Sequence, residues 1–557
     1  MNSDLIPVGI VGAGPVGMAL AARLASFGIP SVLFERDPEL RKQGSKACLI
    51  QGDVLEVLDK FGCAETIGAE GVTWTTARTY VRGKEIRAAE YTRRIGYGPF
   101  VNISQFRIEQ LLLEKVEAGA LTEVRWSHEI TGVEQDGEAV TVTADTPDGP
   151  RSYRCRYVVA CDGVRSPMRA LTGVEWTGYS HQDRFLITDL KVKLPLAKER
   201  HFHYDPPFNP GRQLVMHPQP NDIWRIDWQL APDTDIEAER ADGRFDARVR
   251  AVIGDVDYEI DWLSTYRFHQ RVVEKFRLGR IFFAGDSAHS LPPYGSRGMN
   301  SGIQDADNLA WKLALVMQGK AEDALLDTYH DERHAAAKEN LAVTEATIKF
   351  MVPPNLARRI ARKVLLTLSR PFQGARDKVN SGRMAEPYTY TASAITESAE
   401  RHPLLGAFAP DARITAPGAV RVRELYGAGF TGLYFAPDRA AARAFAERAL
   451  ADTRGLAARL IVVLREGELA VPAAGPASDM PDGVTVLRDR DGVLREAYRA
   501  AEGTCLVVRP DGHLAALAEA ERPELFGATL ARCAVATAPA SAPAAAPDRA
   551  GRVPAAA

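Results

Sequence analysis

Two glycine-rich stretches, far apart in the chain, carry acidic residues that could hold the hydroxyl groups of a bound nucleotide. Residues 12–17 read GAGPVG, and Glu35 follows about 20 residues further on. Residues 283–302 read FAGDSAHSLPPYGSRGMNSG, in which Asp286 follows a short apolar strand and Asn300 opens a helical pattern. Glycine lets the backbone approach a planar ligand, and a helix start offers free N–H groups and a positive dipole end. The two stretches therefore predict a ligand cradle that would stabilise a developing anion.

The first stretch belongs to a strand–helix–strand pattern over residues 5–35. Gly12 would allow the tight turn, Gly14 would let a pyrophosphate lie on the backbone, and Gly17 would let the helix pack on the strand. Glu35 ends the second strand and can bind a ribose hydroxyl. The motif predicts a dinucleotide without distinguishing NAD from FAD, and the choice of FAD rests on the second stretch.

The helix predicted over residues 300–317 is open to two interpretations. Ile303, Ala306, Ala310 and Leu313 form an apolar stripe at helical spacing, as in any core helix after a glycine-rich turn. A helix that presents its first turn to a cofactor must also be anchored in a core. The stripe is therefore compatible with a plain core helix and with a cofactor-binding helix.

A third motif lies in residues 157–169, which read YVVACDGVRSPMR. An apolar strand runs into Asp162, and two arginines follow. Asp162 could hold a cofactor hydroxyl or order the loop, while Arg165 and Arg169 could meet the phosphates of a nicotinamide nucleotide. Alternatively, Asp162 and Arg165 pair with each other and brace the loop.

In this order, the motifs resemble the signatures of the single-component FAD-dependent aromatic hydroxylases, the class A flavoprotein monooxygenases with the fold of 4-hydroxybenzoate hydroxylase. GMNSG, followed closely by DADNLAWKLA, is similar to the subgroup that contains 3-(3-hydroxyphenyl)propionate hydroxylase. The resemblance implies hydroxylation of a phenolic ring with FAD, NAD(P)H and O2 through a flavin C4a-hydroperoxide. A hydroxylase or epoxidase of a polyketide or antibiotic-type substrate is the alternative, and a non-enzymatic dinucleotide sensor is a second. The ring substrate, the position of attack and the choice of NADH or NADPH stay open.

The resemblance extends the set of cofactor contacts. Residues 104–112 match the family's helix start, where Gln105 and Arg107 lie against FAD, although Ser104 could merely cap a helix with Arg107 in solvent. Lys46 stands where many family members have an arginine. The full predicted set is Gly12, Ala13, Gly14, Pro15, Val16, Gly17, Glu35, Arg36, Lys46, Gln105, Arg107, Asp162, Gly163, Arg165, Gly285, Asp286, Pro293, Gly298, Met299 and Asn300.

Residues 184–267 change to a period of two, which predicts an antiparallel sheet. In the family such a sheet covers the flavin and forms the substrate pocket. A tryptophan-rich face over residues 224–228 alternates with a polar face that carries Arg225, Asp227 and Gln229. The tryptophan face is expected to be sheet core.

Hydroxylation needs an electron-rich ring, so we expect a base for the phenol on strands between residues 201 and 228. Histidine has a suitable pKa. We rank His217 first as the base, then His203, then Tyr266. Arg212 is expected to bind the anionic form of the substrate, and Pro293 is expected at the loop beside the flavin. The structural alternative is that a histidine at a strand end simply packs there.

The chain has 557 residues, a net charge of −3 and six cysteines without metal-binding or C-x-x-C spacing. These features predict a cytoplasmic protein with reduced thiols, without a metal, a nucleic-acid partner or stable membrane association. A small aromatic substrate and O2 are the expected partners, and a homodimer is left open.

The predicted fold class is α/β in three domains. A Rossmann-type FAD-binding domain spans residues 1–183 and 268–387, and an antiparallel-sheet substrate domain spans 184–267. A thioredoxin-like domain without a thiol role follows over 388–533, and the Ala/Pro-rich tail 534–557 is expected to be disordered.

Overall fold

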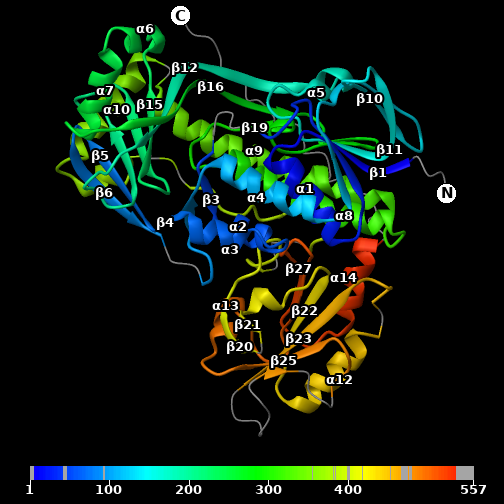
Figure 1. Ribbon diagram of the computed structural model, residues 1–557. Coiled ribbons are helices and arrows are strands. Elements are labelled where there is room, and N and C mark those ends of the chain that lie inside the picture. The colour runs from blue at the N-terminus through cyan, green and yellow to red at the C-terminus, as the bar shows by residue number, and fades with distance from the viewer. Residues whose placement is uncertain are drawn as a thin grey trace, which may run out of the picture.

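A computed structural model describes residues 5–41, 47–91, 95–353, 355–379, 382, 384–397, 402–416, 418–451, 453–465, 474–475 and 480–534. Figure 1 shows three parts, which we call the Rossmann domain, the sheet domain and the C-terminal domain. The predicted α/β fold class is confirmed.

A mainly parallel sheet, in the order β17-β18-β11-β1-β2-β8, forms the centre of the Rossmann domain. β1 (Leu5–Val11) pairs in parallel with β2 (Ser31–Phe34) and β11 (Arg151–Ala160). Helices cover both faces, so the central strands are almost wholly apolar and buried. Its other strands are β8 (Thr122–Arg125), β9 (Glu129–Gln135), β10 (Val140–Asp145), β17 (Arg277–Leu278) and β18 (Ile281–Phe283). Its main helices are α1 (Pro15–Ser26), α4 (Gln105–Ala118), α5 (Pro167–Thr172) and α8 (Gly298–Met317).

A smaller layer joins this domain to the sheet domain. It comprises β3 (Leu49–Gln51), α2 (Gly52–Asp59), α3 (Ala64–Glu70), β4 (Val72–Trp74) and β7 (Phe100–Asn102). β7 pairs with both β3 and β4 in one three-stranded sheet.

The sheet domain is an eight-stranded sheet in the order β19-β16-β12-β15-β14-β13-β5-β6. Its strands are β5 (Thr76–Val81), β6 (Lys84–Glu90), β12 (Trp176–Lys191), β13 (Arg200–Tyr204), β14 (Gln213–Pro218), β15 (Ile223–Gln229), β16 (Glu259–Val273) and β19 (His289–Ser290). β12 and β16 run from this domain to the Rossmann domain (Figure 1). The boundaries predicted at residues 184 and 267 fall inside these two strands, because one continuous ribbon serves both domains.

The two faces of this sheet have different coverings. α6 (Ile236–Ala241) and α7 (Arg244–Ile253) lie on the outer face and pack on Trp224, Ile226 and Trp228. The tryptophan face is therefore core, as the alternation of the sequence predicts. The inner face is turned toward the Rossmann domain.

Two long helices complete this half of the molecule. α9 (Asp327–Met351) follows η2 (Asp323–Leu326), and α10 (Leu356–Leu368) and α11 (Gln373–Arg376) follow α9. α10 carries an exposed apolar stripe of Leu356, Ile360, Val364 and Leu368.

The C-terminal domain has a mixed sheet in the order β24-β25-β23-β22-β26-β27. β22, β23 and β25 are parallel, whereas β26 runs antiparallel to β22, in keeping with the predicted thioredoxin-like domain. Its elements are β20 (Arg413–Ala416), β21 (Ala419–Arg421), η3 (Val422–Leu425), β22 (Phe430–Phe435), α12 (Arg439–Ala449), β23 (Ala458–Arg465), β24 (Ala474–Gly475), β25 (Val484–Asp489), α13 (Val493–Tyr498), β26 (Cys505–Val508), β27 (Leu514–Ala518) and α14 (Glu524–Ala534). The predicted tail therefore begins inside α14, and residues 535–557 lie outside the described part of the chain.

The turn between β26 and β27 docks the C-terminal domain onto α8 and α9. Arg509 is fully buried there and donates to Glu332 and to Asp511. Lys312 also donates to Glu332, at 2.7 Å. The four groups carry two positive and two negative charges, so their burial is electrically balanced.

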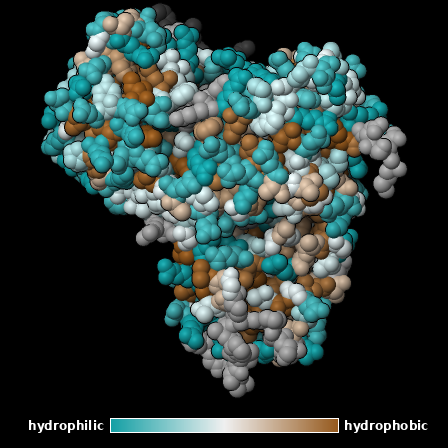
Figure 2. Space-filling model, viewed as in Figure 1, coloured by the Kyte–Doolittle hydropathy of each residue, from teal (hydrophilic) through white to brown (hydrophobic). Residues whose placement is uncertain are grey.

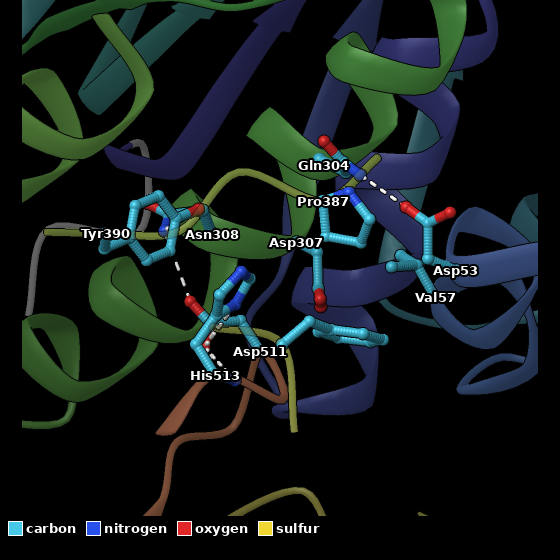
Figure 3. Close-up of a pocket in the computed structure, with 10 residues that line it drawn as sticks. Asp53, Val57, Gln304, Asp307, Asn308, Pro387, Tyr390, Asp511 and His513 are labelled. Atoms are coloured by element: carbon cyan, nitrogen blue, oxygen red, sulfur yellow. Dashed lines mark hydrogen bonds and ion pairs between the residues drawn. The ribbon is translucent and has the colours of Figure 1, made fainter. Parts of the chain in front are cut away.

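A small cavity of about 20 Å³ lies at this interface and is lined by Asp307, Asn308, Asp511 and His513 among others (Figure 3). Such a space holds about one water molecule. It is too small for a cofactor or an aromatic substrate, so the functional site lies elsewhere.

The surface shown in Figure 2 is mostly hydrophilic, with apolar residues scattered among polar ones. None of the helices within the described residues has the length and apolar character needed to span a bilayer. All six cysteines are buried and free of disulfides.

Candidate functional site

The loop between β1 and α1 combines tight packing with one open position. A Cβ on Gly12, whose φ is +106°, would lie 2.6 Å from the Cys161 carbonyl oxygen, and one on Gly17 would lie 2.1 Å from the Gly12 oxygen. Both positions therefore exclude a side chain. A Cβ on Gly14 would meet no atom within 4 Å. This open face of the loop is where a pyrophosphate could lie on the backbone.

Val16 joins this loop to the second glycine-rich stretch. A Cβ on Gly285 would come within 2.9 Å of Val16 Cγ2, and a Cβ on Gly302 within 2.5 Å. Gly285 opens the short helix η1 (Gly285–Ser287), and Gly302 lies in the first turns of α8. The two motifs are far apart in the chain and thus form one packed unit.

The acid Glu35 lies beside the same loop. Its carboxylate accepts hydrogen bonds from the Ala13 N–H at 2.8 Å and from the Asp37 N–H at 3.0 Å. An open depression of about 140 Å³ is lined by Ala13, Gly14, Glu35 and Glu109 among others. Burial raises the pKa of Glu109 to about 7. This depression suits the nucleoside end of a dinucleotide, with Glu35 at its edge.

Around η1 and the start of α8, side chains are fixed from several directions. Asn300 accepts from the Gln51 N–H at 3.0 Å and donates to the Leu49 oxygen at 2.9 Å, so its side chain holds β3. Asp286 is half-buried, and its Oδ1 is 3.8 Å from the position that a Cβ on Gly298 would take. Asp286 and the open end of α8 therefore lie together, as a cofactor cradle requires.

Two other predicted residues of this loop differ in exposure. Pro293 is exposed, and Met299 is half-buried against the Rossmann core. Ser296 has a φ of +54°, a left-handed conformation that is uncommon outside glycine. The loop is therefore held in a specific shape between β19 and α8.

In the third motif, Asp162 orders its own loop, one of the roles that its sequence allows. Asp162 accepts from the Met168 N–H at 2.9 Å and so caps α5, and among the described residues no ion pair joins it to Arg165. Arg165 is exposed, so the proposed brace is wrong. Asp162 Oδ1 is buried and lacks a hydrogen-bond partner in the described structure. Burial raises the pKa of this carboxyl group.

Arg169 is the buried arginine of this motif. It donates to the carbonyl oxygens of Gly163 at 3.2 Å, Asp286 at 3.2 Å and Ser287 at 2.9 Å, and it lies 3.8 Å from the ring centre of Trp176. Its charge therefore joins the loop after β11 to η1. A role for Arg169 in binding phosphate is not compatible with these contacts, whereas exposed Arg165 stays available.

The remaining predicted cofactor contacts lie at the edge of the site or outside the described chain. Arg107 forms a bidentate ion pair with Glu70, with both distances 2.8 Å, on the protein surface. Ser104 caps α4 by accepting from the Arg107 N–H. These contacts match the structural alternative for Arg107. Arg36 is exposed, and Lys46 lies outside the described residues.

Gln105 lies closer to the nucleoside depression than Arg107 does. Its Oε1 accepts from the Ala47 N–H at 3.2 Å, and its Nε2 donates to Glu109 at 2.8 Å. Since Glu109 lines the depression, Gln105 orients one of its walls.

Asp305 is a buried residue that sequence reasoning missed. It accepts from the Gly285 N–H at 3.0 Å, from His289 Nε2 at 2.7 Å and from Arg333 Nε at 2.7 Å. His289 Nε2 is therefore occupied by its hydrogen bond to Asp305. The only hint in the sequence is a pair of acids, Asp305 and Asp307, near the start of the helix predicted over residues 300–317.

The inner face of the sheet domain presents three cross-strand rows of side chains. From the register of β13, β14, β15 and β12, one row contains Arg200, His217, Arg225 and Asp189. The next contains Phe202, Val215, Asp227 and Ile187, and the third contains Tyr204, Gln213, Gln229 and Phe185. β16 adds Tyr266 opposite Phe185. A charged row, a mainly apolar row and an aromatic and amide row thus lie side by side.

This face contacts the flavin loop directly. Gln213 Nε2 donates to the Tyr294 hydroxyl at 2.7 Å, and the Tyr294 ring lies 5.5 Å from that of Phe268. Tyr294 follows Pro293, so the inner face of the sheet domain and the candidate cofactor cradle meet here. An aromatic molecule bound at this place would contact the inner face and the cradle.

The charged row combines a fixed ion pair with a neutral histidine. Arg225 donates twice to Asp189, at 2.7 Å each, and both side chains are buried. Burial and the nearby charges of Arg200 and Arg225 hold the pKa of His217 well below its ordinary value. With His217 neutral, the row carries two positive charges and one negative charge, which favours an anion.

The ranking of catalytic residues needs correction. His203 faces the outer side of the sheet, because its register partner is Leu214, and burial lowers its pKa to about 4. It stacks on Tyr80 at 4.5 Å. Arg212 precedes β14 at the sheet edge, where it donates to the Pro210 oxygen at 3.4 Å. Of the predicted set, His217 and Tyr266 lie on the inner face of the sheet, which meets the Pro293 loop through Tyr294.

No group of three or more His, Cys, Asp or Glu side chains within the described ranges is placed to hold a metal ion. The open face of Gly14, the Asp286 turn and the start of α8 fit a flavin dinucleotide in position and in charge.

Comparisons with known proteins agree with this geometry. The family described as an FAD binding domain matches residues 6–344, and that described as an HcaD C-terminal domain matches residues 406–532. A 3-(3-hydroxy-phenyl)propionate/3-hydroxycinnamic acid hydroxylase of Mycolicibacterium smegmatis is 30% identical over 539 residues, covering 94% of this chain and 93% of that protein.

A hydroxylase of the same description from Burkholderia vietnamiensis is 28% identical over 532 residues, covering 93% of this chain and 95% of its own. The solved structure of the flavin-dependent monooxygenase PieE, in complex with FAD and substrate, has a TM-score of 0.77. It is 24% identical and covers 96% of this chain and 100% of PieE, a likeness that shows the fold.

Proposed function

The chain belongs to the FAD binding domain family and is a flavoprotein aromatic hydroxylase, and from this premise we propose that it acts on a phenol that carries a carboxylate side chain. The observation that carries the proposal is the inner face of the sheet domain, where a net positive row lies beside an apolar row and meets the flavin loop through Tyr294. The relatives' substrates, by their names, are phenols with a carboxylate-bearing chain.

In this proposal the Rossmann domain contacts successive parts of the cofactor. The backbone at Gly14 takes the pyrophosphate, Glu35 takes the ribose, and Asp286 takes a hydroxyl of the ribityl chain. The open end of α8, near Asn300, faces the edge of the ring system that becomes negative on reduction. Bound FAD would supply the chemistry of accepting a hydride from NAD(P)H and of activating O2.

The sheet domain supplies the substrate side. The charged row containing Arg200 and Arg225 would hold the carboxylate, and the apolar row with Val215 would lie under the aromatic ring. The Tyr294 loop would close the space between them and exclude water from the reacting atoms. Arg165, exposed on the loop after β11, would meet the nicotinamide nucleotide.

Substrate-stimulated consumption of NAD(P)H by the FAD-loaded protein tests the proposal. The panel should contain phenols with and without a carboxylate chain, and large polycyclic phenols of the polyketide type. We expect the carboxylate-bearing phenols to stimulate consumption most and to give products one oxygen atom heavier. Stimulation by polycyclic phenols alone would favour the alternative substrate class, and no stimulation by any phenol would refute the proposal.

A further inference from the structure

We propose that Asp227 on β15 removes the proton of the substrate phenol. This inference rests on the proposed function, since it needs a phenol on the inner face of the sheet. It replaces His217, His203 and Tyr266 as the expected base.

Asp227 is the one ionisable side chain in the apolar row of the inner face, all four residues of which are described. Its register partners are Val215 on β14 and Ile187 on β12, and Phe202 lies beyond Val215 on β13. An aromatic ring that lies on these apolar side chains would therefore meet a single carboxylate. This arrangement differs from that of the neighbouring row, where Asp189 is committed to Arg225.

The hydrogen bonds of Asp227 leave an acceptor unused. Asp227 Oδ1 is buried without a hydrogen-bond partner in the described part of the chain. The residue as a whole keeps some accessible surface, as do Val215 and Tyr266 on the same face. A buried carboxylate oxygen without a partner destabilises the folded protein unless something binds there. A phenol hydroxyl would satisfy it.

Three charged groups on three strands act on Asp227. Arg225 lies on the same strand, Asp189 on β12 and Arg200 on β13, and their charges act on its carboxyl group. Burial raises the pKa of Asp227 to about 7, and the two arginines oppose this effect. A base with a pKa near neutrality is partly ionised at working pH and can both accept and return a proton.

The remaining titratable neighbours are poorer bases. His217 on β14 is held neutral by burial and by two arginines, so it accepts a proton only well below neutral pH. Tyr266 on β16 has a pKa raised well above its ordinary value by burial and by the charge of Asp227, so it stays protonated. Burial raises the pKa of the Cys48 thiol to about 12. Tyr266 can therefore donate to the substrate oxygen but cannot take its proton.

Proton transfer to Asp227 leaves the buried charge unchanged. Before transfer, the negative charge lies on Asp227, beside the two arginines. The substrate O–H bond then breaks, an O–H bond forms on Asp227, and the phenolate takes over the negative charge. The C–H bond at the hydroxylated carbon then breaks and its hydrogen leaves as a proton, while the proton on Asp227 returns to the phenolic oxygen of the product. No charge is created in the buried site, so the step avoids the large penalty of burying an uncompensated ion.

The position also fits a phenol with a carboxylate chain. Asp227 and Arg225 are two residues apart on one strand, a separation of about 6.6–6.8 Å along β15. A carboxylate on the charged row would thus place the hydroxyl of a short-chain phenol one row away, over Asp227. Substrates of this class should need both rows.

A nitrophenol provides a direct test, because its phenolate absorbs visible light and its neutral form does not. The FAD-loaded protein should bind the nitrophenol as the phenolate at a pH below the pKa of the free compound. Asp227→Asn should bind it in the neutral form, and Asp227→Glu should restore part of the phenolate signal. Asp222→Asn is the matched control. It removes a carboxylate from the turn of the same hairpin, whose φ of +57° suits asparagine.

Single-turnover kinetics give the second readout. Asp227→Asn should slow oxygen transfer by roughly 10²–10⁴-fold, the range for loss of a general base, while flavin reduction and FAD content stay at the level of the control. A phenolate signal in Asp227→Asn equal to that of the wild type would overturn the inference. A wild type that binds and hydroxylates phenols but never ionises the nitrophenol would overturn it too. If no phenol binds or stimulates NAD(P)H consumption in the wild type, the proposed function itself fails.

Discussion

Replacing Arg509 should weaken the attachment of the C-terminal domain by more than any single surface change. Its guanidinium group is fully buried and donates to Glu332 on α9 and to Asp511 in its own turn. Arg509→Met leaves two buried carboxylates facing one ammonium group, that of Lys312, whose pKa burial lowers to about 8. Removing one partner of a buried ion pair costs about 3–5 kcal/mol. We therefore expect a loss of this size in the free energy of unfolding.

Two further variants separate charge balance from packing. Arg509→Met combined with Glu332→Gln restores equal numbers of positive and negative charges, so it should be more stable than Arg509→Met alone. Arg522→Ala removes an exposed arginine that pairs with Glu524 at 3.3 Å, and such pairs contribute about 0–1 kcal/mol. Urea unfolding of the FAD-loaded protein, followed by circular dichroism and by flavin release, measures all three.

The same interface should be sensitive to acid. The arginine and lysine neighbours hold the pKa of Glu332 well below its ordinary value, and Arg509 does the same for Asp511. A depressed folded pKa gives stability that is present above the unfolded pKa of about 4 and is lost as the pH falls toward the folded value. The free energy of unfolding of the wild type should therefore be lower at pH 3 than at pH 7. The difference between the two pH values should be smaller for Arg509→Met. If Arg509→Met lost less than about 1 kcal/mol, or if the double variant were the less stable of the two, the reasoning from charge balance would be refuted.

Three other predictions concern the cofactor site. Asp286→Ala should weaken FAD binding by about 1.5–3 kcal/mol through loss of a charged hydrogen-bond partner, as measured by flavin fluorescence on titration; unchanged affinity would contradict its place in the cradle. Arg165→Ala should slow flavin reduction by NAD(P)H in stopped-flow experiments while oxygen transfer from pre-reduced enzyme is retained, and the reverse pattern would remove it from the nucleotide site. Gly14→Ala should fold and bind FAD less tightly, because its Cβ enters open space, whereas Gly17→Ala should lower the yield of folded protein, because its Cβ meets the Gly12 oxygen at 2.1 Å. Equal folding yields for the two glycine variants would argue against this packing.

The cofactor half of the molecule could be predicted from the sequence better than the substrate half, for a physical reason. The glycine motifs have strict local geometry, so the spacing of Gly12 and Gly17 is enough to assign them to a tight turn and a close helix. The period of two in residues 184–267 likewise places Trp224 and Asp227 on opposite faces. In both cases the information lies within a few neighbouring residues.

Contacts that depend on distant parts of the chain could not be predicted in this way. His203 and His217 look equivalent in the sequence, and only the register of β13 with β14 puts them on opposite faces. Arg169 cannot be separated from Arg165 without knowing that η1 lies beside the loop after β11. The turn at Arg509 has the sequence of an ordinary surface turn, and it is buried only because α9 packs against it.

Val16 has a consequence for how this sequence can change. Its side chain fills the space above Gly285 and Gly302, two positions that are far from it in the chain. A side chain at Gly302 is tolerated only if Val16 becomes smaller, and a residue larger than valine at position 16 cannot be compensated because both of its neighbours are already glycine, so substitutions at positions 16 and 302 should be epistatic. A chimera that receives residues 283–302 from a relative therefore needs a side chain of matching size at position 16. Recombination between this chain and its relatives should succeed most often when these segments are exchanged together.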